Sequence, residues 1–276
     1  MSHPLDGPRS KVERAREHSR VLNHEWRVFW EAHANKVSLD VDFDGTWYKI
    51  SVSPPLKESP PLRFSVICGD TVHNLRSALD HLVWQLVLSE GRKRPGSRNF
   101  FPIYTDFDDF IREVRSRKKK SRPGPLEGIN PKGDAWTFIE DLQPYKRREL
   151  GMDPRAHQLA VLNRLSNTDK HRTLHVYMAF AGRESVESMV EWNPAAVLLE
   201  KRHGSLPLSL EHETEVLRLR FSETGPDPQV KVRMNGAITF DPSFGDGKFQ
   251  PTLALIGDEI SRFVSEIIER SERFFS

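Results

Sequence analysis

The chain has 276 residues, enough for one large domain or two small ones, and its 37% hydrophobic and 29% charged residues are typical of a globular protein with a solvated surface. Its net charge of +2 excludes the strong overall basic field of a dedicated nucleic-acid-binding protein. The single cysteine, Cys68, excludes an intramolecular disulfide framework and a cysteine-based zinc site, and we expect it to be buried.

No run of about 18 apolar residues occurs in the chain, so we expect no membrane-spanning helix. Residues 1–20 lack the apolar core of a signal peptide. Together these two features predict a cytoplasmic protein.

The first predicted helix covers residues 10–34, where apolar side chains recur at alternating steps of three and four. Two short strands follow, near 37–43 and 46–53. The first of them alternates apolar and polar residues, and Asp44-Gly45 is typical of a tight hairpin turn. Prolines then separate these strands from the next element.

A long central helix is predicted over residues 62–89, with Gly91 placed to cap its end. The irregular stretch 91–103 ends in four residues, Phe100 to Ile103, that we expect to be buried and extended. A short helix near 106–117 leads into a run of basic residues from Arg115 to Arg122, which we call the basic run.

Another helix is predicted over residues 154–168, and the pattern then becomes that of β structure up to residue 240. The predicted strands are 175–180, 196–199, 216–221 and 230–234, and the turn signal Asn235-Gly236 leads into a further strand at 237–240.

The last predicted helix covers residues 251–274 and repeats the heptad spacing of 10–34. The two terminal helices should therefore pack lengthwise. The residues expected at their contact are Leu22, Trp26, Phe29, Ile260, Phe263 and Ile267.

These elements predict an α+β protein with a single domain over residues 1–276. Its helical bundle is formed by 10–34, 62–89, 154–168 and 251–274, and a small antiparallel β layer is inserted at 173–240.

The central helix has an apolar side and an opposite side rich in groups that bind and transfer protons. At 100° per residue, that second side carries Asp70, His73, Asn74, Ser77, Asp80 and His81. A merely solvated helix face is usually built from Lys, Glu and Gln. The His, Asp, Asn and Ser residues found here are poorer helix formers but versatile hydrogen-bonding groups. The pattern indicates a functional face.

A second polar cluster closes the helix predicted over 154–168, and it consists of Asn167, Asp169, Lys170, His171 and Arg172. Asp169 falls in the inward sector of that helix, where a carboxylate needs a cation or hydrogen-bond donors. We expect it to meet Arg76, His73 or His81. A buried hydrogen-bond network that only fixes the register of the helices is the alternative interpretation.

The segment Arg76-Ser-Ala-Leu-Asp-His81 resembles the Arg-(four residues)-His motif of the HEPN superfamily. That resemblance implies a helical bundle and a metal-independent endoribonuclease of a toxin or phage-defence system, acting on RNA, usually across a homodimer interface. It implies that Arg76 stabilises the phosphate and that His81 transfers protons. Asp169, His73 and Asn74 complete the catalytic candidates. The wider pattern around both clusters is also similar to a family of uncharacterised bacterial proteins, which implies no activity.

Two other chemistries fit the same residues less well. His73, Asp80, His81, Asp169 and His171 are of types that bind metal ions but show no diagnostic spacing, so we expect neither a metal nor a cofactor. Ser77 lies inside a helix, without the strained turn that exposes a nucleophilic serine.

The basic run is a candidate binding arm, because its clustered cations could grip phosphates in a salt-dependent manner. A solvated loop is the alternative. With the second cluster, the predicted binding residues are Lys118, Lys119, Lys120, Arg122, Lys170, His171 and Arg172.

Two functional hypotheses follow. In the first, the protein is the metal-independent endoribonuclease that the resemblance implies, with RNA as substrate. In the second, it is a non-catalytic binding or interaction protein whose polar helix faces are structural. They differ in whether Arg76 and His81 border an open cleft or are sealed in the core.

Overall fold

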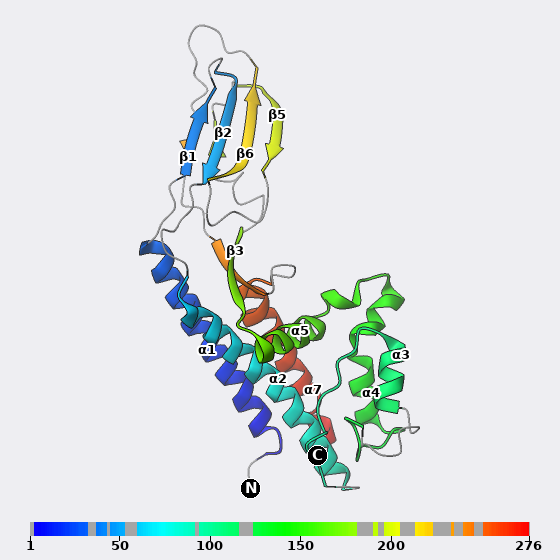
Figure 1. Cartoon of the computed structure of the whole chain (residues 1–276). Helices are drawn as coiled ribbons and strands as arrows, with labels where there is room; N and C mark the ends of the chain where they lie inside the picture. Colours follow the sequence, from blue (N-terminus) through cyan, green and yellow to red (C-terminus); the bar gives the residue numbers. More distant parts are fainter. Residues whose placement is uncertain are drawn as a thin grey trace. The chain divides into compact units, whose positions relative to one another are not determined.

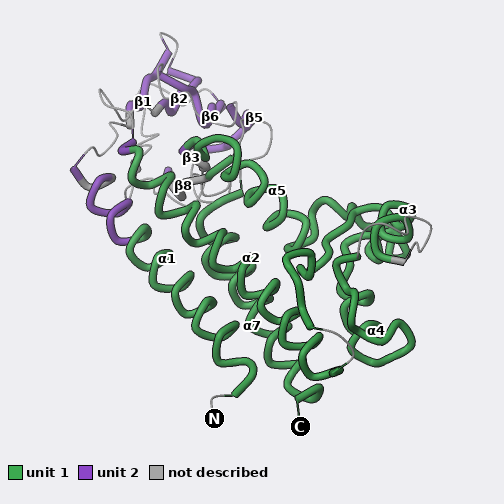
Figure 2. The backbone as a smooth tube through the Cα atoms, turned by 60° about the horizontal axis from the view of Figure 1, so that its bottom comes forward, with its two compact units in different colours: residues 1–23, 62–175, 244–276 green, residues 24–61, 176–243 purple. Residues whose placement is uncertain are grey.

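The structure is a computed structural model that describes residues 3–32, 37–42, 45–52, 60–91, 94–115, 124–180, 190–192, 196–204, 213–222, 233–234, 240–245 and 251–275. The chain packs into two compact units, coloured separately in Figure 2. Unit 1 combines residues 1–23, 62–175 and 244–276, and unit 2 combines 24–61 and 176–243. The helices and the antiparallel sheet confirm the α+β class, whereas the single domain stays a prediction.

Unit 1 is built around α2 (Leu62–Glu90), which lies beside α1 (Asp6–Ala32) and α7 (Ser261–Arg270) in both views of the chain (Figures 1 and 2). Helix α5 (Gln158–His171) also packs on α2. The predicted helix 62–89 is thus confirmed, and Gly91 ends it at φ 64° with its N–H bonded to the Leu88 carbonyl.

Helix α2 buries most of its circumference, so the predicted polar side is only a narrow exposed strip. Asp70, His73 and His81 are exposed and follow one another along this strip, with Trp84 41% exposed. Asn74 and Arg76, by contrast, are buried. Any helix with one exposed side carries polar residues on that side, so the exposed strip of α2 is also consistent with simple contact with solvent.

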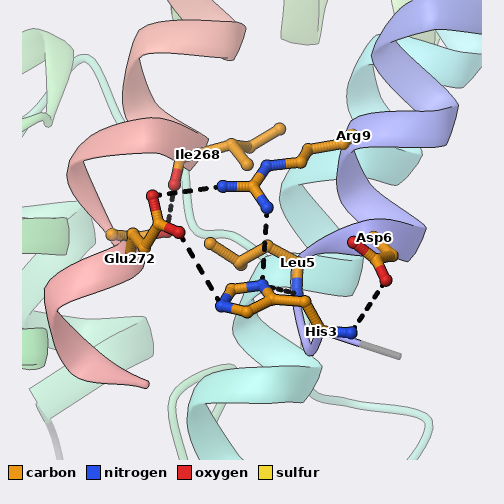
Figure 3. A network of polar contacts seen from close by, with 7 residues as sticks. His3, Leu5, Asp6, Arg9, Ile268 and Glu272 are labelled. Atoms are coloured by element: carbon orange, nitrogen blue, oxygen red, sulfur yellow. Dashed lines mark hydrogen bonds and ion pairs between the residues drawn. The ribbon is translucent and has the colours of Figure 1, made fainter. Parts of the chain in front are cut away.

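The two terminal helices pack lengthwise within unit 1, as the shared heptad spacing predicted, and they run antiparallel. A Cβ atom on Gly257 would lie only 2.4 Å from the Ser19 Oγ, so the two backbones approach closely there. At the other end, Arg9 Nη2 lies 3.2 Å from Glu272 Oε2, and His3 Nδ1 accepts a hydrogen bond from the Leu5 N–H (Figure 3).

Phe263 does not belong to the predicted seam. Residues Leu255–Ile260 form a π-helical turn before α7, which has more residues per turn than an α-helix. The buried stripe therefore passes from Ile260 to Val264, and the Phe263 ring packs instead against His157, with ring centroids 5.4 Å apart. Trp26 and Phe29 lie in unit 2, and their contact with the C-terminal helix stays a prediction.

Shorter elements complete unit 1, and several differ from the predictions. The helix near 106–117 is α3 (Phe107–Phe110), N-capped by Asp106, followed by a π-helical turn at Ile111–Arg115. Helix α4 (Asp134–Asp141) and the 3-10 helix Pro144–Leu150 were not predicted. The 3-10 helices Pro154–Ala156 and Glu272–Phe274 lie within segments that were predicted as α-helix. The predicted helix 154–168 is wrong at both ends, because α5 begins only at Gln158 and continues to His171.

Unit 2 contains a four-stranded antiparallel sheet of β1 (Val37–Val41), β2 (Trp47–Val52), β6 (Thr214–Phe221) and β5 (Leu198–His203), in that order. The β layer is therefore not an insertion of residues 173–240 alone, since the predicted hairpin at 37–53 forms half of it. Its inner face buries Ile50, Leu219 and Phe221.

The remaining strands pair differently from the prediction. Strand β7 (Arg233–Met234) pairs with β4 (Val190–Glu191), and β8 (Phe240–Gly245) pairs with β3 (His175–Phe180). The strands on either side of Asn235-Gly236 thus have other partners, while the turn itself lies outside the described residues. Among the helices that the structure describes, none has both the length and the apolar character needed to span a membrane.

Candidate functional site

Arg76 and Asp80 together hold both backbone polar groups of one residue, Phe101, in the extended segment after α2. The Arg76 guanidinium donates a hydrogen bond of 2.7 Å to the Phe101 carbonyl, and Asp80 Oδ1 accepts one of 2.9 Å from the Phe101 N–H. The two side chains also form an ion pair of 3.3 Å between Nη2 and Oδ1. We call this arrangement the Phe101 clamp, and it satisfies both backbone polar groups of Phe101, which is fully buried.

Burial shapes the electrostatics of the clamp. It lowers the pKa of the Arg76 guanidinium, against the opposing charge of Asp80. It also raises the pKa of the Asp80 carboxyl, against the charge of Arg76 and the Phe101 N–H. The Arg76 side chain is 11% exposed, and its Nη1 is buried without a hydrogen-bond partner among the described residues.

His81 lies on a different side of α2 from the clamp. It is exposed, and a Cβ atom on Gly7 of α1 would lie 3.7 Å from its Nδ1. Within the chain, Arg76 therefore points to the Phe101 segment while His81 points toward α1. The two residues of the HEPN-like motif do not converge on one point.

Asn74 links α2 to α1. Its Nδ2 donates a hydrogen bond of 2.8 Å to the Asp70 carbonyl, and its Oδ1 accepts one of 3.4 Å from Lys11 Nζ. These contacts account for both ends of the side-chain amide. They give Asn74 a structural role in the packing of the two helices.

Asp169 lies where α5 crosses α2. A Cβ atom on Gly69 would be 2.5 Å from its Oδ1, so the absence of a side chain at Gly69 makes room for the carboxylate. Burial, followed by the charge of Asp70, raises the pKa of Asp169, and the charge of His73 opposes this. The two polar clusters therefore approach each other here, as predicted, through Gly69, Asp70 and His73 rather than through Arg76 or His81.

A pocket of 830 Å³ lies on the other side of α5, within unit 1. Ala160, Asn163, Asn167, Thr168 and His171 share the open face of α5, because they are spaced by three and four residues. The opposite wall comes from other segments. The full lining is Ile103, Tyr104, Thr105, Asp109, Asp153, Arg155, Ala156, Ala160, Asn163, Arg164, Asn167, Thr168, His171 and Arg172.

The pocket wall offers three guanidinium groups, two carboxylates and several amides and hydroxyls. Asp153 forms an ion pair of 3.1 Å with Arg155, and Asp109 is paired with Arg112, which lies outside the lining. Cations therefore outnumber carboxylates around the opening. A wall of this kind suits an anionic ligand with further polar groups.

The Phe101 clamp positions one wall of this pocket. Residues 103–105 follow Phe101 after one residue, Pro102, and Gln143 Oε1 accepts a hydrogen bond of 3.1 Å from the Tyr104 N–H. Burial raises the pKa of the Tyr104 hydroxyl, so it stays protonated and can donate to a ligand. Arg76 and Asp80 thus support the pocket from behind without lining it.

His157 fixes the start of α5 and thereby the opposite wall. Its Nδ1 accepts a hydrogen bond of 3.1 Å from the Leu159 N–H, which is an N-terminal cap made by an imidazole. Burial, together with the charge of Arg147, lowers the pKa of His157 to about 4. The ring is therefore neutral and able to accept this hydrogen bond at neutral pH.

The second predicted cluster is divided by the structure. Asn167, His171 and Arg172 line the pocket, and Asp169 turns toward α2. Lys170 is exposed, and its charge acts on Asp80. The sequence analysis did not identify Asn163 and Arg164. Their spacing of three and four residues from Asn167 and Thr168 places them on the same face of α5 and could have identified them.

The basic run stays untested as a binding arm. Lys118, Lys119, Lys120 and Arg122 lie outside the described residues. Within the described ranges, no group of three or more His, Cys, Asp and Glu side chains is arranged to hold a metal ion. Comparison of the chain with known protein families, with curated proteins and with solved structures yields no match.

Proposed function

We propose that the protein is a non-catalytic binding protein that holds an anionic ligand in the α5 pocket. The main observation in support is the pocket of 830 Å³, whose wall includes Arg164 and Arg172 together with the amides of Asn163 and Asn167. Its volume lies within the range of small-molecule sites. Guanidinium groups bind phosphate or carboxylate oxygens in pairs, and the amides supply donors and acceptors for uncharged parts of a ligand.

The positions of Arg76 and His81 favour this proposal over the endoribonuclease. Arg76 is engaged in the Phe101 clamp, and His81 faces α1, so one chain offers no common site for a phosphate and a proton-transferring imidazole. The ribonuclease hypothesis, its RNA substrate and its homodimer stay predictions.

Isothermal titration of the whole chain with adenosine monophosphate and with inorganic phosphate tests the proposal. We expect Arg172→Ala to weaken binding at least about tenfold, because a charge-assisted hydrogen bond contributes about 1.5–3 kcal/mol. Arg262→Ala, an exposed arginine of α7 outside the pocket, is the matched control and should bind as the wild type does. Absence of binding, or equal binding by all three proteins, would contradict the proposal.

A cleavage assay separates the two functions. Single-stranded RNA incubated with the protein and EDTA should stay intact if the protein only binds. Cleavage by the wild type that is lost in His81→Ala would instead support the endoribonuclease, because His81 is exposed and its removal leaves the core unchanged.

A further inference from the structure

The solvated face of the sheet in unit 2 gathers arginines around one tryptophan. Side chains alternate along a strand, so Trp47 and Lys49 of β2 share a face with Arg218 and Arg220 of β6 and with Arg202 of β5. The opposite face carries the buried Tyr48, Ile50, Leu217 and Leu219. We call the first face the Trp47 face.

The Trp47 ring is the centre of this face. The guanidinium carbons of Arg202, Arg220 and Arg218 lie 5.1, 5.4 and 5.9 Å from its ring centroid. Three cations within cation–π distance of one ring form a dense group of positive charge beside an aromatic surface. Mutual repulsion among guanidinium groups makes such a group receptive to anions.

Some of this charge is already compensated. Arg202 pairs with Glu200, and Arg218 pairs with Glu215 at the edge of the group. Arg220 is exposed and, among the described residues, has the Trp47 ring rather than a carboxylate as its neighbour. Arg220 is therefore the cation that a bound phosphate would meet first.

We propose that the Trp47 face binds single-stranded nucleic acid. The proposal is independent of the α5 pocket, because the two sites lie in different units. Phosphates complement the arginines, and an unpaired base can stack on the Trp47 ring in place of a guanidinium. Paired bases inside a duplex cannot reach a flat sheet face in this way, so the face discriminates single strands from duplexes.

Fluorescence anisotropy with a labelled 12-nucleotide RNA, at several salt concentrations, tests the proposal. We expect Arg220→Ala to weaken binding about fivefold or more and to reduce the slope of log affinity against log salt by about one phosphate contact. Trp47→Leu should weaken binding about 5- to 100-fold, and Trp47→Phe should recover most of that loss, because base stacking needs an aromatic ring.

Two further variants make the test specific. Glu200→Gln should tighten binding, since it releases Arg202 from its carboxylate partner. Arg262→Ala removes the same charge from an exposed position of unit 1 outside both proposed sites and should leave RNA affinity unchanged. Because Arg172→Ala tests the α5 pocket and Arg220→Ala tests the Trp47 face, failure of one proposal is distinguishable from failure of the other. Circular dichroism confirms that each variant is folded. The proposal is overturned if the wild type binds no RNA at low salt, if a duplex binds as tightly, or if folded Arg220→Ala and Trp47→Leu bind like the wild type.

Discussion

Phe101 is held through both its backbone N–H and its backbone carbonyl, and this makes Arg76 and Asp80 mutually dependent. If Asp80 is replaced by Ala, the Arg76 guanidinium keeps its charge in a site where its side chain is 11% exposed. We therefore expect Asp80→Ala to lower the free energy of unfolding by about 1–3 kcal/mol, because Arg76 is buried while the Asp80 side chain is itself 34% exposed. Urea denaturation at pH 7 measures this change.

His81→Ala is the control for the clamp. His81 is next to Asp80 on α2 but exposed, so its removal should change the free energy of unfolding by no more than about 0.5 kcal/mol. Equal effects of the two substitutions would show that the clamp contributes nothing to stability.

His157 makes the stability of unit 1 dependent on pH. Its pKa is about 4 in the folded chain against an ordinary value of 6.5, so below pH 6.5 the unfolded chain binds more protons than the folded one. The stabilisation is therefore complete above pH 6.5 and is lost as the pH falls toward 4. Protonation also removes the lone pair of Nδ1 that caps α5.

We expect the free energy of unfolding to fall by about 1–3 kcal/mol between pH 7 and pH 4 through this residue. His157→Asn keeps a capping acceptor but has no proton to bind in this range, so its stability should depend less on pH. Denaturation curves at pH 7, 5.5 and 4 for both proteins measure the difference. Parallel pH profiles would rule out His157 as the titrating group.

At the scale of the elements, helices α2 and α5 cross at a point where a glycine faces a carboxylate. Gly69→Ala should destabilise the protein by about 1–3 kcal/mol, because the new Cβ would lie 2.5 Å from the Asp169 Oδ1. Asp169→Ala removes the obstructing atoms. It should cost much less than a broken buried ion pair, since burial and Asp70 already disfavour the carboxylate there.

A double-mutant cycle on Gly69→Ala and Asp169→Ala isolates this crossing. The double variant should be more stable than Gly69→Ala alone, with a coupling energy of about 1 kcal/mol or more. Additive effects would mean that α5 shifts away from α2 to accommodate the methyl group.

For the whole molecule, local patterns predicted the elements better than their partners. The period of three and four residues located α1 and α2 and predicted the lengthwise packing of α1 against the last helix, because amphipathic spacing is a property of the segment itself. The pairing of β2 with β6 could not be predicted, since the two strands are far apart in the chain. The alternation of apolar and polar residues identifies a strand but not the strand with which it pairs. The burial of Val264 in place of Phe263 was not predicted either. The heptad spacing applies to an uninterrupted α-helix, whereas a π-helical turn precedes α7.

The candidate site was predicted in part. Residue types singled out Arg76, Asp80 and Asp169, and each is engaged in a specific contact, but their chemistry could not reveal that Arg76 supports a backbone. The pocket forms because the segment 103–105 lies opposite α5 in the folded chain. A local sequence pattern cannot predict such a long-range contact.

The close contact of Ser19 with Gly257 determines when α1 can finish folding during synthesis. Almost the whole chain separates these residues, so at 5–20 residues per second α1 waits on the order of 10–50 seconds for its partner. During that interval the side of α1 that carries Ser19 and packs on the last helix is exposed to chaperones and proteases. Ribosome-bound chains arrested at residue 250 should therefore be cleaved within α1, whereas the complete chain should resist, and equal resistance would show that α1 is covered earlier by α2.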